Sequence, residues 1–217
     1  MAKRIYLSPS DQTSNKYATG NTNEEKICEQ IADACEIALK RCGFEVKNNK
    51  TSSMANRVKE SDAWGADLHV PIHTNAFNKK TTGTRLFCYN TSGEGYKACK
   101  AVFNVLAPLT PGTSENVTAN KTLYEVRVPK APTVYIEVDF HDVDAVAKWL
   151  INNTEAIGET IAKGICNYYG VKFVEQEKPA EKKEVLYRVQ VGAYASKANA
   201  LAMQKKLKHD GYNAVIV

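Results

Sequence analysis

The first residue in this sequence that could take part in chemistry is a histidine that follows an apolar run. Residues 67–72 are nearly all apolar, as expected of a strand buried on both faces, and they lead directly into His73. Open α/β sheets place their sites at the carboxyl ends of strands, although a lone histidine there is often only structural. His69 lies four residues earlier, about 13 Å away along a strand, so the two cannot comfortably share one metal ion. We therefore interpret His69 as a packed strand residue.

A glutamate near the end of a second predicted strand is the next candidate. Residues 133–138 are rich in β-branched side chains, and Glu137 lies near their carboxyl end. A carboxylate in an apolar strand is costly to bury unless it is paired or has a function. An ion pair with a neighbouring lysine or arginine would explain Glu137 without catalysis. His141 and Asp142 follow on the exit loop.

Glu24 is the third candidate, at the first turn of a predicted helix. Asn23 precedes it with N-cap chemistry, and the helix macrodipole alone favours a carboxylate there, so its position does not demand a function. If the sheet is parallel, this helix start lies at the same edge as the strand ends near residues 10, 73 and 138. Histidine and glutamate side chains at that edge could hold Zn²⁺, with a further glutamate free as a base.

The elements that must position these residues alternate along the chain. Predicted helices cover 24–43, 52–64, 94–107, 142–152 and 154–168, and predicted strands cover 4–7, 44–46, 67–72, 84–89 and 133–138. The segment 108–121 is rich in Pro, Gly, Thr, Ser and Asn and is interpreted as a loop. This order predicts an α/β domain over residues 1–173, with a mostly parallel sheet and helices on both faces.

Two further parts are predicted after this domain. Residues 174–185 are charged and offer almost nothing to bury, which is typical of a linker. Residues 186–217 predict a small C-terminal β-α-β unit, with strands at 187–192 and 213–217 around a helix at 196–208. Because the open strand edges of so small a unit invite pairing, we expect it to promote a homodimer.

Composition excludes several classes of protein. The 217 residues carry a net charge of +5 without a block of like charges, which does not indicate nucleic-acid binding. No apolar stretch approaches the roughly 20 residues of a membrane span, and the N-terminal residues lack the features of a signal peptide. We therefore expect synthesis in the cytoplasm. The six cysteines form no C-x-x-C pair, so a structural zinc site is not indicated.

Several runs of the first domain resemble the zinc-dependent N-acetylmuramoyl-L-alanine amidases of the amidase-3 type. Residues 66–76 resemble the family run ADL-x-x-x-IH-x-NA, and residues 131–140 resemble its P-x-V-x-x-E-x-x-F strand; shorter matches lie at 5–10, 23–25 and 84–87. The resemblance implies that His73 and Glu24 are zinc ligands and that Glu137 is the catalytic glutamate. Asn75, in the same run as His73, is expected to contact the substrate.

One departure from the family concerns the third ligand. The family usually has a Gly-His pair after its first strand, and that histidine binds zinc, whereas this loop reads Ser-Pro-Ser-Asp-Gln over residues 8–12. Catalytic zinc sites normally keep three protein ligands. We prefer His141 as the replacement, because imidazole suits zinc better than a further carboxylate, with Asp11 as the alternative. A site that binds metal weakly or not at all is the third possibility.

The C-terminal residues resemble the sporulation-related (SPOR) repeat, a module that binds glycan strands. The matches are 187–194, 199–200, Leu207 and 211–212, which make up the first half of that module. Together the resemblances imply hydrolysis of the amide between N-acetylmuramic acid and L-alanine in bacterial peptidoglycan, as in an endolysin released by lysis or a sporulation autolysin. The alternatives are a peptidoglycan-binding protein without catalytic activity and a metal-free α/β binding protein.

Overall fold

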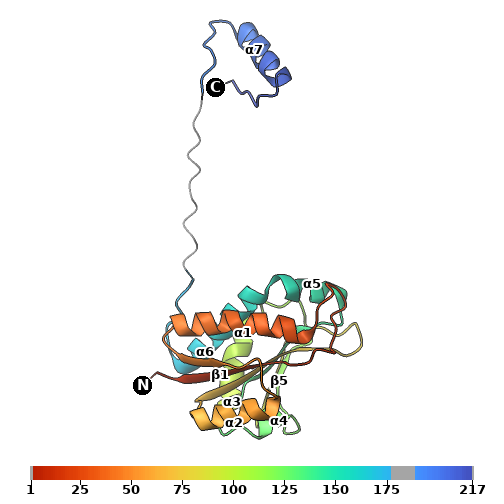
Figure 1. The fold of residues 1–217 in the computed structure, drawn as a ribbon, viewed down its shortest axis with the longest axis vertical. Helices are drawn as coiled ribbons and strands as arrows, with labels where there is room; N and C mark the ends of the chain where they lie inside the picture. The colour runs from red at the N-terminus through yellow and green to blue at the C-terminus, as the bar shows by residue number, and fades with distance from the viewer. Residues whose placement is uncertain (1, 177–188, 217) are drawn as a thin grey trace. The chain divides into compact units, whose positions relative to one another are not determined.

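The computed structural model describes residues 2–176 and 189–216 (Figure 1). The chain divides into two compact units, Met1–Gln176 and Glu177–Val217. Among the described residues, no helix combines the length and the apolar character needed to cross a membrane.

The first unit is built on a six-stranded sheet in the order β2-β1-β3-β6-β4-β5. The strands are β1 (Arg4–Pro9), β2 (Glu45–Asn48), β3 (Leu68–Asn75), β4 (Arg85–Cys88), β5 (Asn116–Ala119) and β6 (Tyr135–Phe140). The four strands β2, β1, β3 and β6 are parallel, and β4 runs antiparallel to β6 with β5 parallel to β4. The predicted fold class, a mostly parallel α/β sheet, is confirmed, and the parallel strands bring their carboxyl ends to one edge.

Helices cover both faces of the sheet. On one face α1 (Glu24–Arg41) packs against α6 (Thr154–Tyr169), and α6 packs against α3 (Glu94–Leu106). The helix α2 (Met54–Trp64) lies across the sheet from α1 (Figure 1). The short helices α4 (Tyr124–Arg127) and α5 (Asp144–Asn152) lie on either side of β6 in the sequence.

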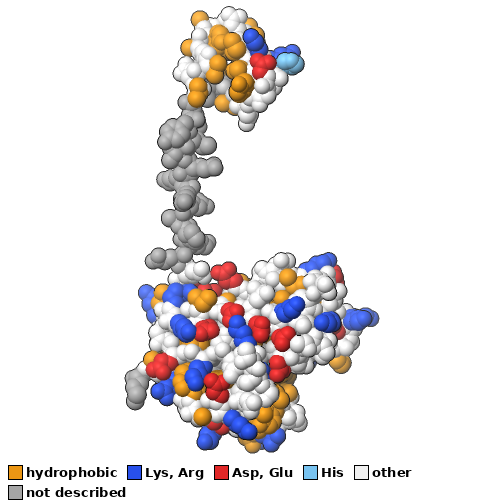
Figure 2. Space-filling view, in the orientation of Figure 1, with side chains coloured by type: hydrophobic (Ala, Val, Ile, Leu, Met, Phe, Trp, Pro, Cys, Tyr) orange, Lys and Arg blue, Asp and Glu red, His pale blue; other side chains and the backbone are white. Residues whose placement is uncertain are grey.

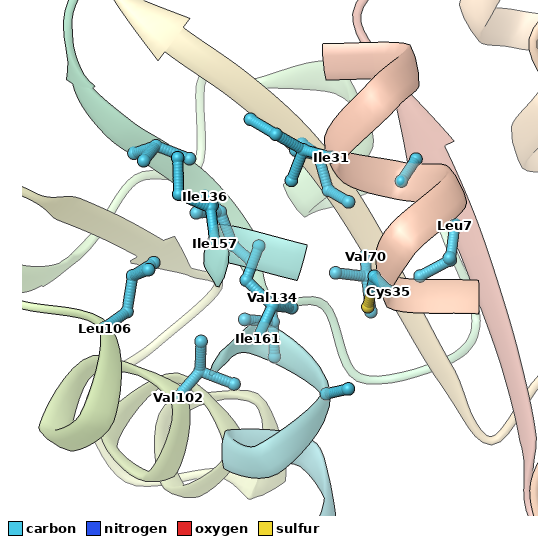
Figure 3. Close-up of a cluster of buried hydrophobic side chains, with 14 of the residues drawn as sticks. Leu7, Ile31, Cys35, Val70, Val102, Leu106, Val134, Ile136, Ile157 and Ile161 are labelled. Atoms are coloured by element: carbon cyan, nitrogen blue, oxygen red, sulfur yellow. The ribbon is translucent and has the colours of Figure 1, made fainter. Parts of the chain in front are cut away.

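The main core lies between the sheet and the helices α1, α3 and α6. Figure 3 shows side chains from these elements converging in one layer, and the labelled residues are Leu7, Ile31, Cys35, Val70, Val102, Leu106, Val134, Ile136, Ile157 and Ile161. All ten are fully buried. Burying one such aliphatic side chain contributes about 1.5–3 kcal/mol, so this layer fixes how α1 and the strands meet.

A glycine makes a close contact between two helices of this layer possible. A Cβ atom at Gly158 of α6 would lie 2.5 Å from the backbone oxygen of Ile31 on α1. That distance is too short for any side chain, so the two helix backbones approach this closely only because residue 158 has none. The contact holds α1, and with it the Glu24 end of the helix, against the rest of the unit.

The segment 108–121, predicted as a loop, contains a strand. β5 lies within it and pairs in parallel with β4 at the margin of the sheet. β5 is only four residues long, and Val117 is half-buried while its neighbours are exposed. So short a strand has too little alternation of apolar and polar residues to be recognised among turn-forming residues. The bounds of β6 also differ from the prediction, since the strand begins at Tyr135 rather than at residue 133.

The described part of the second unit contains one helix, α7 (Lys197–His209), as predicted. Residues 189–196 and 210–216, on either side of it, have no assigned strand; residues 187, 188 and 217 of the two predicted strands, and 177–185 of the predicted linker, lie outside the described residues. Figure 2 shows hydrophobic side chains gathered on the visible face of this unit, and the exposed ones include Val189, Val191, Leu201, Tyr212 and Val215.

Candidate active site

His73 and Glu24 meet at the carboxyl edge of the parallel strands. The Nδ1 atom of His73, near the end of β3, lies 2.8 Å from Oε1 of Glu24, the first residue of α1. Asn23 caps that helix by accepting a hydrogen bond from the backbone N–H of Lys26 at 3.0 Å. Asn15 donates to the other carboxylate oxygen of Glu24 at 2.7 Å. The cap and the loop therefore fix the carboxylate against the imidazole, and both side chains are buried.

Glu137 lies beside His73 on the neighbouring strand. The two residues are register partners on β3 and β6, and the ring of Tyr135 stacks on the His73 ring with centroids 4.7 Å apart. Burial raises the pKa of Glu137 to about 7, against the opposing charges of His73 and Arg85. A carboxyl group with a pKa near neutrality is suited to exchanging protons at neutral pH.

The carboxylates around His73 control its charge. Burial alone would lower the pKa of His73, but the carboxylates of Glu125 and Glu24 outweigh burial and raise it to about 10. Burial also opposes ionisation of Glu24, yet its hydrogen bond with His73 holds the pKa of that carboxyl below its usual value. Without a bound cation, His73 therefore carries a proton on each ring nitrogen and forms an ion pair with Glu24.

His141 contacts Thr74 and Tyr17 rather than this pair of side chains. Its Nδ1 atom lies 2.9 Å from Oγ1 of Thr74, and its ring stacks on Tyr17 with centroids 4.8 Å apart. Asn75, two residues beyond His73, accepts a hydrogen bond from Ala76 N–H at 2.8 Å through its side-chain oxygen. Within residues 2–176 and 189–216, no three His, Cys, Asp or Glu side chains are arranged to hold a metal ion.

The loop after β1 contributes Gln12 rather than Asp11 to the vicinity of His73. The carboxylate of Asp11 faces the guanidinium of Arg57 at 3.4 Å. The side-chain amide of Gln12 lies 3.4 Å from Nδ1 of His73, the same nitrogen that contacts Glu24. Gln12 thus lies where a third protein ligand would stand if Glu24 and His73 bound a metal ion.

Glu125, in α4, is a buried site residue that the sequence did not reveal. Its Oε1 accepts hydrogen bonds from the Ser8 hydroxyl at 2.5 Å and from His69 Nε2 at 3.2 Å. Its Oε2 lies 4.0 Å from His73 Nε2. Burial would raise the pKa of Glu125, but the neighbouring His69, His73 and Ser8 side chains lower it to about 2. The only sequence signal was a glutamate in a four-residue helical segment, which is unremarkable by itself.

The interpretation of His69 as a packed strand residue is confirmed. Its side chain is fully buried, and its ring stacks on Tyr6 with centroids 5.5 Å apart. Nδ1 contacts the Ser61 hydroxyl at 3.1 Å, while Nε2 contacts Glu125. Both ring nitrogens are thus engaged inside the protein, and His69 has none left for a ligand.

Comparisons with known proteins relate this chain to two families. Residues 5–167 match the Amidase_3 family, described as N-acetylmuramoyl-L-alanine amidase, and residues 170–217 match the SPOR domain. The chain is 26% identical to the sporulation-specific N-acetylmuramoyl-L-alanine amidase of Bacillus subtilis (strain 168), over 99% of this chain and 84% of that protein. It is 24% identical, with the same coverage, to the N-acetylmuramoyl-L-alanine amidase CwlM of Bacillus licheniformis.

A solved structure supports the fold of the first unit. The catalytic domain of the amidase CwlV from Bacillus (Paenibacillus) polymyxa var. colistinus superposes with a TM-score of 0.69 at 21% identity, covering 78% of this chain and 99% of that one. The family match spans well over half of the sequence and includes Glu24, His73 and Glu137. This chain therefore belongs to the N-acetylmuramoyl-L-alanine amidase family.

Proposed function

We propose that this protein hydrolyses the amide bond between N-acetylmuramic acid and L-alanine in peptidoglycan, with zinc as its cofactor. The observation that carries the proposal is the contact of Glu24 with His73 at 2.8 Å, with Glu137 as the register partner of His73. These three side chains stand at the edge of the sheet where α/β proteins place their sites. A bound zinc ion would lower the pKa of water and polarise the amide carbonyl.

The Glu24–His73 pair fits two zinc ligands. Donor atoms of two ligands on one tetrahedral zinc ion lie roughly 3.4 Å apart, as follows from bond lengths near 2.1 Å. The observed separation of 2.8 Å needs only a small opening. The anionic carboxylate and the imidazole are both donors that zinc accepts readily.

Gln12 is our proposal for the third protein donor. The side chain expected from the sequence, His141, packs against Tyr17 and Thr74, and Asp11 faces Arg57. Gln12 already lies 3.4 Å from the His73 nitrogen that would bind the metal. A half-turn of its side-chain amide would present the oxygen instead of the nitrogen. An amide oxygen is a weaker donor than the family's usual histidine, so we expect moderate zinc affinity.

Glu137 would act as the general base and then as the general acid. Its carboxylate would take a proton from the attacking water and return it to the leaving amine of L-alanine. Its pKa of about 7, raised by burial, suits both transfers near neutral pH. Asn75 stands at the end of β3 beside these groups and is proposed to hold the substrate through its side-chain amide.

The second unit is proposed to hold the enzyme on the cell wall. The SPOR domain matched by residues 170–217 supports this role. The Bacillus subtilis relative is named as sporulation-specific, which favours a sporulation autolysin over an endolysin as the setting for this chain. Self-association through the second unit remains part of the proposal, because several of its hydrophobic side chains are exposed.

The test is digestion of purified peptidoglycan, with detection of newly exposed N-terminal alanine by mass spectrometry. Wild-type protein with zinc is expected to release it, and chelation should stop the release while zinc should restore it. A wild-type protein that binds sacculi but releases nothing would instead be a peptidoglycan-binding protein. This second candidate is favoured because, within the described part of the chain, no three His, Cys, Asp or Glu side chains are arranged to hold a metal ion.

A further inference from the structure

We infer that Glu125 is a positioning residue for the proposed metal site, where its carboxylate accepts the Nε2 hydrogen of His73 and so directs Nδ1 toward the metal. The inference rests on the proposed function, in which His73 is a ligand. Its starting point is a geometric fact: the two nitrogens of the His73 ring face two different carboxylates. Nδ1 faces Glu24 at 2.8 Å, and Nε2 faces Glu125 at 4.0 Å.

Two buried polar atoms without hydrogen-bond partners mark the contact. His73 Nε2 and Glu125 Oε2 are each buried, and neither has a partner among the described residues. An unsatisfied buried polar atom costs about 1–3 kcal/mol, so two complementary ones on facing side chains call for an explanation. The 4.0 Å gap would close by about 1 Å to form a hydrogen bond, and such contacts are often long before a site is loaded.

The chemistry of the two groups decides the direction of the hydrogen bond. An ionised carboxylate can only accept, so the hydrogen must lie on Nε2 of His73. A neutral imidazole with its hydrogen on Nε2 has a lone pair on Nδ1. Nδ1 is the nitrogen that faces Glu24 and Gln12. Glu125 therefore selects the ring form of His73 that can bind metal on the Glu24 side, as carboxylates behind metal-binding histidines commonly do.

Glu125 is held in place by a buried chain of hydrogen bonds. Arg57 donates through Nε to the Ser8 hydroxyl at 2.8 Å, and Ser8 donates to Oε1 of Glu125. His69 Nε2 lies 3.2 Å from the same oxygen. These partners come from α2, β1 and β3, so three elements fix one carboxylate. They occupy only Oε1, which leaves Oε2 for His73; a role limited to pairing with His69 would not account for this second oxygen.

The same geometry argues against Glu125 as a direct ligand of the proposed ion. One metal ion cannot bind both nitrogens of a single imidazole ring, since their lone pairs point in different directions. An ion shared by Glu24 and Nδ1 of His73 lies across the ring from Glu125. Glu125 would therefore affect the ion only through His73.

Zinc affinity of the full chain, measured by competition with a chromophoric chelator, tests the inference. Glu125→Gln should weaken zinc binding about tenfold to a hundredfold, the usual effect of losing such a partner. Glu137→Gln is the matched control, since it neutralises another carboxylate beside His73 and should keep near-normal affinity while losing turnover. Ser8→Ala removes only the hydroxyl that anchors Glu125 and should weaken binding in the same direction by a smaller factor, which keeps the test informative if Glu125→Gln fails to fold.

Each outcome decides the question. Normal zinc affinity in Glu125→Gln overturns the inference, and complete loss of binding, as expected for Glu24→Gln, would make Glu125 a ligand and also overturn it. If wild-type protein binds no zinc, the proposed function fails, and NMR of ¹⁵N-labelled histidine in the zinc-free protein then decides the inference separately. An exchange-protected hydrogen on His73 Nε2 that loses protection in Glu125→Gln supports it, and a bare Nε2 in the wild type overturns it.

Discussion

His73 and Glu137 are register partners on the parallel strands β3 and β6, and Arg85 on β4 is in turn the register partner of Glu137. Three charged or polar side chains thus form one row across three neighbouring strands. Their spacing is set by backbone pairing in the sheet, so it does not depend on loop conformation. This row explains why single substitutions within it should change chemistry while leaving the fold in place.

The first prediction concerns Glu137 itself. Glu137→Gln keeps the shape of the side chain but cannot accept a proton, so turnover on peptidoglycan should fall by about 10²–10⁴-fold. Circular dichroism and zinc affinity should stay close to those of the wild type. Turnover within a few-fold of the wild type would remove Glu137 from the proposed mechanism.

The second prediction concerns pH. The base must be ionised, and burial raises the pKa of Glu137 to about 7, so activity should fall as the pH drops through that pKa. A bound cation would move this fall in activity, which is the acidic limb of the pH profile, to somewhat lower pH. Arg85 lowers the pKa of Glu137, so Arg85→Gln should shift the limb to higher pH. The measurement is kcat/KM against pH, with Lys148→Gln, on the exposed face of α5, as the control. An unmoved limb in Arg85→Gln would contradict the electrostatic link.

The third prediction concerns the missing ligand. Gln12→Ala should weaken zinc binding more than either His141→Ala or Asp11→Ala, because of these three side chains Gln12 is the one that lies beside the metal-facing nitrogen of His73. Gln12→Glu should strengthen binding, since it places a charged oxygen donor at the same point. Equilibrium competition for zinc across the four variants gives the ranking. A ranking led by His141→Ala would restore the ligand preferred from the sequence.

The fourth prediction concerns the second unit. Removal of residues 177–217 should leave a folded first unit with normal turnover on soluble muropeptides, because Met1–Gln176 is compact by itself. The shortened chain should sediment less with purified sacculi and should have a lower average mass in sedimentation, since the exposed hydrophobic side chains of the second unit are gone. Tyr212→Ser in the full chain is the point-variant control for the mass. Equal pull-down and equal mass for the long and short chains would exclude both proposed roles.

Much of the fold could be predicted because its elements are long and regular. The apolar run before His73 and the β-branched run around Glu137 each produced a strand, and helical periodicity located α1 and α6. β5 was missed because four residues, all but one of them exposed, carry too little pattern. Predicting it would have required knowing that β4 offers a free edge, which is a property of the assembled sheet.

The site was only partly predictable for a similar reason. Glu24 and His73 stand at the ends of regular elements, so their meeting follows from the topology. Glu125 and Gln12 belong to a one-turn helix and a loop, and their places depend on contacts with Ser8, His69 and Asn15. No periodicity records such contacts.

The reversal of strand direction between β6 and β4 divides the connections of the first unit into two groups. Those that follow β1, β3 and β6 emerge where Glu137 and His73 stand, and those that follow β4 and β5 emerge at the opposite rim, near Tyr89 and Thr133. Under the proposed function, the first group would border a bound wall fragment. The connection that follows β5 nevertheless returns to the candidate site, because it carries α4 and places Glu125 against His69 and His73.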